Sequence, residues 1–129
     1  MNLQELEKIR EKTLKAMRER GIGAKCVVKV DMGSAGMAAG AMEVYQTLLT
    51  EIRKRNVRDI VVLQTGELGM DAFEPIVSVN VKGKSEIYYG KVTPEIAVRI
   101  ITDHIINGKI LDEYVISIKE ENREEKENV

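Results

Sequence analysis

Apolar side chains near the N-terminus recur every three or four residues, and charged side chains fill most positions between them. The members of this stripe are Leu3, Leu6, Ile9, Leu14 and Met17. This spacing is typical of an amphipathic helix, and the sequence "GIG" that begins at Gly21 indicates where the helix ends. We therefore predict a helix over residues 2–20 with its charged side chains in solvent.

Beyond residue 24 the pattern changes to short β-branched runs separated by a second helical pattern. The two runs, residues 25–30 and 58–65, are predicted strands. The segment between them opens with a glycine-rich turn and becomes helical from about Gly36. The buried side of that helix is marked by Met37, Ala41, Val44, Leu48 and Ile52. A strand, a helix and a strand in this order predict a parallel pair joined by a crossover.

The second half of the chain predicts a hairpin and a further helix. Residues 75–81 and 85–90 are expected strands around a turn that contains Gly83. A helix follows from its cap at Thr93 to about Asn107, and a glycine stands directly after it. Together the elements predict an α/β fold with a mixed sheet of thioredoxin-like type, in which a βαβ unit is followed by a hairpin and a helix.

The chain is expected to form one domain. A chain of 129 residues is long enough to bury a core without disulfides. We predict a single domain over residues 1–118, in which residues 1–22 are an N-terminal helical extension and residues 109–118 are extended. The tail, residues 119–129, is charged, has no apolar residue before its last position and is expected to be disordered.

Composition argues against several classes of partner. The 20 basic and 21 acidic residues give a net charge of -1, so no basic footprint for nucleic acid or anionic lipid is present. Four tyrosines, one phenylalanine and no tryptophan offer no platform for stacked bases. No apolar run approaches the roughly 20 residues of a membrane span, and the N-terminus lacks the apolar centre of a secretory signal. The prediction is a cytoplasmic protein without nucleic-acid or membrane partners.

Acidic residues follow both predicted parallel strands. Asp31 ends the first strand, and Glu67 and Asp71 come after the second. Because the carboxyl ends of adjacent parallel strands lie close together, these carboxylates suit an acid–base pair or a hard divalent cation. Solvated carboxylates at a loop mouth are the plainer interpretation of the same residues.

The other polar candidates favour structural roles. Gly33, Gly36 and Gly40 lie where a strand meets a helix, but their spacing matches neither the dinucleotide fingerprint nor the P-loop. His104 has no second histidine at metal-binding spacing and is expected to be a structural histidine. Cys26, the only cysteine, lies in a strand among apolar neighbours and is expected to be an inert buried thiol.

Two loops and the C-terminal segment carry a family resemblance. The loops read "VDMGSAGMAAGA" from Val30 and "QTGELGMDAFEP" from Gln64, and the later segments read "YYGKVTPE" from Tyr88 and "HIINGKILDEYVI" from His104. In order and spacing they resemble the thioredoxin-like 2Fe-2S ferredoxins, which occur as small proteins and as domains of NAD(P)-reducing iron hydrogenases and of respiratory complex I. The resemblance covers about residues 25–116.

The chain departs from that family at the positions that hold the cluster. In the family, two cysteine thiolates from each loop bind the cluster. Matching the loops residue by residue places the ligand positions at Asp31, Ala35, Glu67 and Asp71, and none of these is cysteine. Thiolates suit Fe–S clusters, carboxylates suit hard cations, and an alanine side chain ligates nothing. The resemblance therefore implies a member that has lost its cluster and has no cofactor, resident metal or catalytic residue.

The function that the resemblance implies is structural. We expect a degenerate 2Fe-2S ferredoxin-like protein that is not an enzyme or an electron carrier. It would act as a scaffold or regulatory partner of an iron hydrogenase or of an NAD(P)-linked flavoprotein complex. Two alternatives stay open: a divalent-metal site at Asp31, Glu67 and Asp71, and a purely dimerising domain in which the hairpin edge and the first helix supply the contact.

Overall fold

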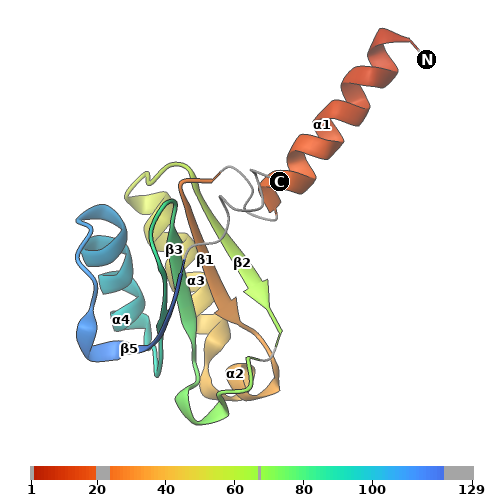
Figure 1. Ribbon diagram of the computed structural model, residues 1–129. Coiled ribbons are helices and arrows are strands. Elements are labelled where there is room, and N and C mark those ends of the chain that lie inside the picture. The colour runs from red at the N-terminus through yellow and green to blue at the C-terminus, as the bar shows by residue number, and fades with distance from the viewer. Residues whose placement is uncertain (1, 20–23, 67, 121–129) are drawn as a thin grey trace.

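A five-stranded mixed sheet forms the centre of the molecule (Figure 1). The computed structural model describes residues 2–19, 24–66 and 68–120. Along the sheet the strands lie in the order β2-β1-β3-β4-β5. Their bounds are Cys26–Asp31 for β1, Ile60–Thr65 for β2, Val77–Val81 for β3, Glu86–Tyr89 for β4 and Val115–Lys119 for β5. The predicted mixed α/β fold is therefore confirmed.

Strand β1 joins the two predicted sub-structures. It pairs parallel with β2, as the strand–helix–strand pattern predicted, and antiparallel with β3, the first strand of the hairpin. Side chains alternate along it, because successive residues of a strand point to opposite faces. Cys26, Val28 and Val30 enter the hydrophobic core beneath the helices. Asp31 is the last residue of the strand, so it stands at the edge where the loops begin.

Helices α3 and α4 cover the apolar face of the sheet. Helix α3, Ala41–Lys54, contributes Ala41, Val44 and Leu48 to the core, as its predicted periodicity required. Helix α4, Pro94–Arg99, begins at Thr93, whose hydroxyl oxygen accepts a hydrogen bond from the backbone N–H of Ile96 at 3.2 Å. The predicted cap is confirmed.

The segment predicted as one helix from Gly36 is two helices. A short helix, α2, spans Ser34–Ala39, and α3 starts directly after Gly40. Gly40 has a φ of 105°, a left-handed conformation that glycine adopts without a steric penalty. The apolar periodicity continues across this residue, so the pattern alone did not reveal the break.

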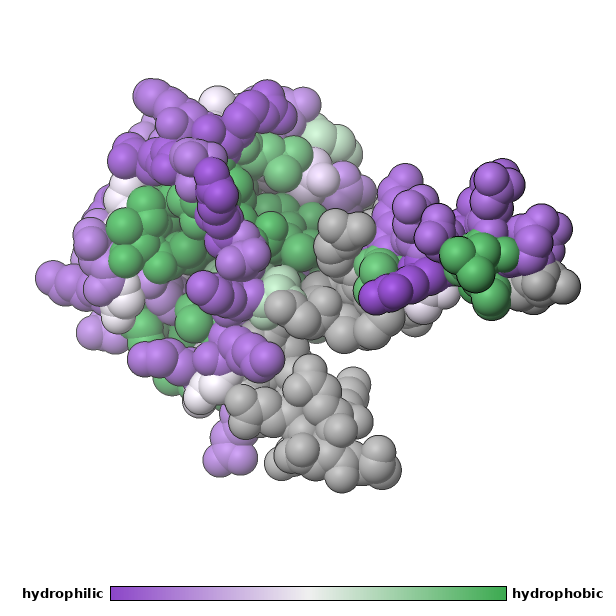
Figure 2. All heavy atoms as spheres, turned by 90° about the horizontal axis from the view of Figure 1, so that it is seen from above, coloured by the Kyte–Doolittle hydropathy of each residue, from purple (hydrophilic) through white to green (hydrophobic). Residues whose placement is uncertain are grey.

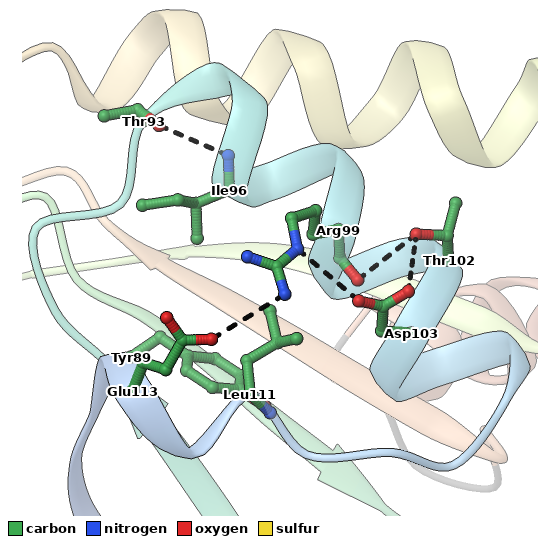
Figure 3. Close-up of polar contacts among 8 residues, drawn as sticks. All are labelled: Tyr89, Thr93, Ile96, Arg99, Thr102, Asp103, Leu111 and Glu113. Carbon is green, nitrogen blue, oxygen red and sulfur yellow. Dashed lines mark hydrogen bonds and ion pairs between the residues drawn. The ribbon is translucent and has the colours of Figure 1, made fainter.

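The C-terminal part of the last helix also differs from the prediction. After α4 the chain continues as η2, a π-helix over Ile100–Ile106, before it ends at Gly108, whose φ is 72°. Arg99 lies at the junction and ties the helix to the following segment (Figure 3). Its guanidinium lies 3.5 Å from a carboxylate oxygen of Asp103 and 3.9 Å from one of Glu113, which belongs to the short 3-10 helix η3, Asp112–Tyr114. The extended C-terminal segment predicted from the sequence thus contains η3 and β5.

The N-terminal helix is present and stands away from the sheet. Helix α1 spans Leu3–Glu19 and extends beyond the body of the molecule in Figure 1. The glycines predicted to end it, residues 21–23, and most of the predicted tail, residues 121–129, lie outside the described residues. Among the described residues, no helix is both long and apolar enough to cross a membrane.

Candidate functional site at the carboxyl ends of the parallel strands

Asp31 ties the two loops of the sheet edge together. Its side chain is only 1% exposed. The backbone N–H of Gly33, in the first loop, donates to Asp31 Oδ1 at 2.9 Å, and the N–H of Leu68, in the second loop, donates to Oδ2 at 3.1 Å. A carboxylate that accepts backbone N–H groups is a strong hydrogen-bond acceptor, so this residue holds both loops from one position.

A second buried acid lies against the first. Glu74 is 9% exposed and follows η1, the 3-10 turn Asp71–Phe73. Its Oε1 accepts a hydrogen bond from the backbone N–H of Ile76 at 3.0 Å, and its side chain also hydrogen-bonds with Asp31. The Glu74–Pro75 peptide bond is cis. Two carboxyl groups in direct hydrogen-bond contact require a proton between them, because two buried carboxylates would repel.

The electrostatics assign that proton to Glu74. Burial, then the hydrogen bond and negative charge of Asp31, and then the charge of Asp71 raise the pKa of Glu74 from 4.5 to about 7. Burial also raises the pKa of Asp31, but the hydrogen bonds with Glu74, Gly33 and Leu68 outweigh it and leave that pKa below 3.8. Below the pKa of Glu74, its protonated side chain donates to the Asp31 carboxylate.

Gly36 permits helix α2 to approach this acid pair. A Cβ atom at Gly36 would overlap the backbone carbonyl oxygen of Asp31 and would lie 3.0 Å from Glu74 Oε1. A glycine here therefore has a packing reason, since no larger residue fits between the helix and the strand end. The glycine-rich turn predicted from the sequence is thus tied to the candidate site.

Of the other candidate positions, the structure describes Ala35 and Asp71. Ala35 is half-buried in α2 and has no donor atom. Asp71 opens η1 and is exposed. Glu67 lies outside the described residues. In the part of the chain that the structure describes, no group of three or more histidine, cysteine or acidic side chains could hold a metal ion. The three-carboxylate metal site stays a prediction, because one of its members is not described.

The residues at this site do not fit a 2Fe-2S cluster. Such a cluster needs soft sulfur ligands, and the four matched positions hold two aspartates, an alanine and a glutamate. Cys26 does not replace them, because it is buried at the opposite end of β1 from Asp31. The carboxylate of Asp31 already accepts hydrogen bonds from both loops. Asp31 therefore joins the two loops by internal hydrogen bonds and does not act as a cluster ligand.

Sequence reasoning did not single out Glu74. It was noted only as part of the motif that ends in "EP", whereas its burial follows from the way the second loop folds back over Asp31. The available signal was an acidic residue that precedes Pro75 and a valine-rich strand, where a solvated carboxylate is out of place. The prediction that Met37 lies on the buried side of its helix is wrong, because its side chain is 45% exposed. Sequence reasoning also missed the exposed apolar side chains of Leu68 and Phe73.

The surroundings of His104 are those expected of a structural histidine. It is buried, and its Nδ1 lies 2.7 Å from the hydroxyl oxygen of Tyr89. That oxygen accepts a hydrogen bond from the N–H of Leu111 at 3.1 Å, so the hydroxyl donates to the imidazole. Burial, and then the positive charge of Lys84, lower the pKa of His104 and keep the ring neutral.

Known proteins share this architecture. No model of a protein family matches the chain. A structure of a thioredoxin-like 2Fe-2S ferredoxin from Aquifex aeolicus superposes with a TM-score of 0.65 and 23% identity, covering 74% of this chain and 94% of the other. The wild-type 1.5 Å structure of a ferredoxin of that description from the same organism gives a TM-score of 0.64 and 24% identity, covering 74% and 99%. The likeness establishes the fold.

A curated protein is also similar to this chain in sequence. Over 92 residues the chain is 21% identical to the NADP-reducing hydrogenase subunit HndB of Solidesulfovibrio fructosivorans, which covers 71% of this chain and 73% of the relative. The resemblance predicted from the loops is confirmed by both comparisons. This chain therefore has the fold of the thioredoxin-like 2Fe-2S ferredoxins, is a distant relative of a hydrogenase subunit, and carries a single cysteine in its sequence.

Proposed function

We propose that this protein is a cluster-free ferredoxin-like subunit that binds a redox protein and does not itself carry electrons. The observation that carries the proposal is the Asp31 carboxylate, which stands at a matched ligand position and is committed to Gly33, Leu68 and Glu74. The loops are thus closed on each other by hydrogen bonds that need no metal. The chain would act as a scaffold or regulatory element, without catalysis.

The loop end also offers a surface for such a partner. Met37 comes from α2, Leu68 from the second loop and Phe73 from η1, and all three are substantially exposed. Figure 1 places α2 and the segment after β2 at the same end of the sheet. Exposed apolar side chains at one end of a sheet can contribute to an interaction surface. Asp71 adds a negative charge there, which favours a partner with basic and apolar residues.

The partner class rests on the curated relative, a subunit of an NADP-reducing hydrogenase. We infer a hydrogenase or an NAD(P)-linked flavoprotein subunit as the partner, in the cytoplasm. The proposed division of the chain is a domain over residues 1–118, with the first 22 residues as a helical extension.

Absorbance and partner capture test the two halves of the proposal. After anaerobic incubation with iron and sulfide, the purified chain should show no charge-transfer bands between about 400 and 600 nm, because it offers no set of thiolate ligands. A 2Fe-2S spectrum would reject the cluster-free state.

For partner binding, Leu68→Asp and Phe73→Asp should abolish co-purification of a redox subunit from native cells. The matched control is Ile106→Asp, which adds the same charge at an exposed apolar residue of η2. Equal capture by all four proteins would reject the loop end as the binding surface.

A further inference from the structure

Helix α1 exposes an apolar face that nothing in the described molecule covers. Every described side chain from Asn2 to Lys15 is exposed, including Leu3 at 74%, Leu6 at 53%, Ile9 at 52% and Leu14 at 44%. Figure 2 shows apolar side chains, in green, on this projecting helix among charged ones in purple. An amphipathic helix of this length is marginal in water by itself, so its apolar face indicates a partner.

The spacing of this face is that of a helix-pairing seam. Leu3, Leu6, Arg10 and Thr13 follow one another at intervals of three and four residues, which places them on one narrow stripe. Ile9 lies on one flank of the stripe, whereas Glu7 and Leu14 lie on the other. The charged Arg10 in the middle of this seam restricts how two such helices can pair.

We propose that α1 pairs antiparallel with α1 of a second copy of this chain. In a parallel pair the Arg10 side chains of the two copies would face each other, which like charges disfavour. In an antiparallel pair with its two-fold axis near residue 8, Leu6 packs against the aliphatic stem of Arg10 of the second copy. The guanidinium of Arg10 then lies beside Glu7 of the second copy, and the two Ile9 side chains meet. The charge pattern is therefore complementary to itself in this orientation.

The attachment of the helix fits the same orientation. The body of the molecule is connected at the C-terminal end of α1 (Figure 1). An antiparallel pair places the two bodies at opposite ends of the helix pair, where they do not collide, whereas a parallel pair would bring them side by side. The net charge of -1 per chain adds little repulsion between copies.

Sedimentation velocity of the full chain over a range of concentrations tests the proposal. The wild-type chain should form a dimer, and Leu6→Asp should abolish it. Lys8→Asp introduces the same side chain on the opposite face of the helix and should leave the dimer intact. A wild-type chain that stays monomeric, or a dimer that Leu6→Asp does not affect, overturns the proposal.

Charge reversal tests the orientation without removing an apolar contact. Glu7→Arg should weaken the dimer at least tenfold, because it sets a positive charge against Arg10 of the second copy. The double variant Glu7→Arg with Arg10→Glu should restore it. Failure of the double variant to restore the dimer contradicts antiparallel pairing. A monomer that instead floats with anionic phospholipid vesicles through α1 would overturn the proposal in favour of a lipid surface.

Discussion

Two buried polar clusters on the same sheet satisfy their hydrogen bonds in opposite ways. At the loop end, Asp31 is held as a charge by two backbone N–H groups and by protonated Glu74. Between β4 and η2, Tyr89 and His104 form a neutral pair closed by the N–H of Leu111. The neutral pair only completes the packing of a helix, whereas the charged pair joins two loops. The buried charge of Asp31 thus lies where backbone N–H groups of two loops converge.

Replacing Asp31 should lower the free energy of unfolding more than any other substitution proposed here. Asp31→Ala leaves the N–H groups of Gly33 and Leu68 without their acceptor and should lower the free energy of unfolding by roughly 3 kcal/mol, because each buried unpaired donor is expensive. Urea denaturation followed by circular dichroism measures the change. Asp71→Ala removes an exposed carboxylate from the same loop region and should change the stability by less than about 0.5 kcal/mol. Similar losses in both variants would show that Asp31 does not tie the loops.

Glu74 should make stability depend on pH. Its pKa is raised in the folded chain, so the folded state binds more protons than the unfolded state between pH 4.5 and about 7. Stability from this group is complete below pH 4.5 and is lost as the pH rises through 7. The loss is on the order of 3 kcal/mol. Glu74→Gln mimics the protonated acid, so it should match the wild type at low pH and exceed its stability at pH 8.

His104 should give the free energy of unfolding a pH dependence of the opposite sign. Its pKa is lowered in the folded chain, so the stability it contributes is present above 6.5 and is lost as the pH falls towards its folded pKa. This contribution is common to the wild type and to Glu74→Gln, so the difference between their denaturation curves isolates Glu74. A difference that does not change with pH would mean that Glu74 is not protonated in the folded chain.

Substitution of Gly36 should destabilise the fold more than substitution of Gly66 in the second loop. Gly36→Ala places a methyl group against the carbonyl oxygen of Asp31 and should destabilise the fold by roughly 2 to 3 kcal/mol through overpacking. At Gly66 nothing lies within 4 Å of an added Cβ, so Gly66→Ala is the matched control and should be near neutral. Thermal melting of both variants compares them, and equal melting temperatures would contradict the close approach of α2.

A substitution in the neutral Tyr89–His104 pair should have the smallest effect on stability. Tyr89→Phe keeps the ring but removes the hydroxyl that donates to His104 and accepts from Leu111, and should cost roughly 1 to 2 kcal/mol. The loop end should be unaffected, so the stability difference between Glu74→Gln and its parent should keep its pH dependence in the Tyr89→Phe background. Coupling between the two changes would show that the two clusters are not independent.

Local features of this chain were determined by its sequence. The stripe of α1, the strand β1, the cap at Thr93 and the turn at Gly83 each depend on the chemistry of neighbouring residues, and each was predicted. The two loop motifs also identified the fold and marked Asp31 as a position of interest. These features can be predicted because each depends on residues that are close together in the chain.

Tertiary structure decided which acids are buried and which apolar residues are exposed. The sequence placed Asp31, Glu67 and Asp71 on equal terms, but the fold buries Asp31, leaves Asp71 exposed and brings in Glu74. The break at Gly40 and the π-helical turns of η2 were likewise seen only in the structure. Burial depends on contacts between segments far apart in the chain, and those contacts set the protonation of Glu74. No local pattern records them.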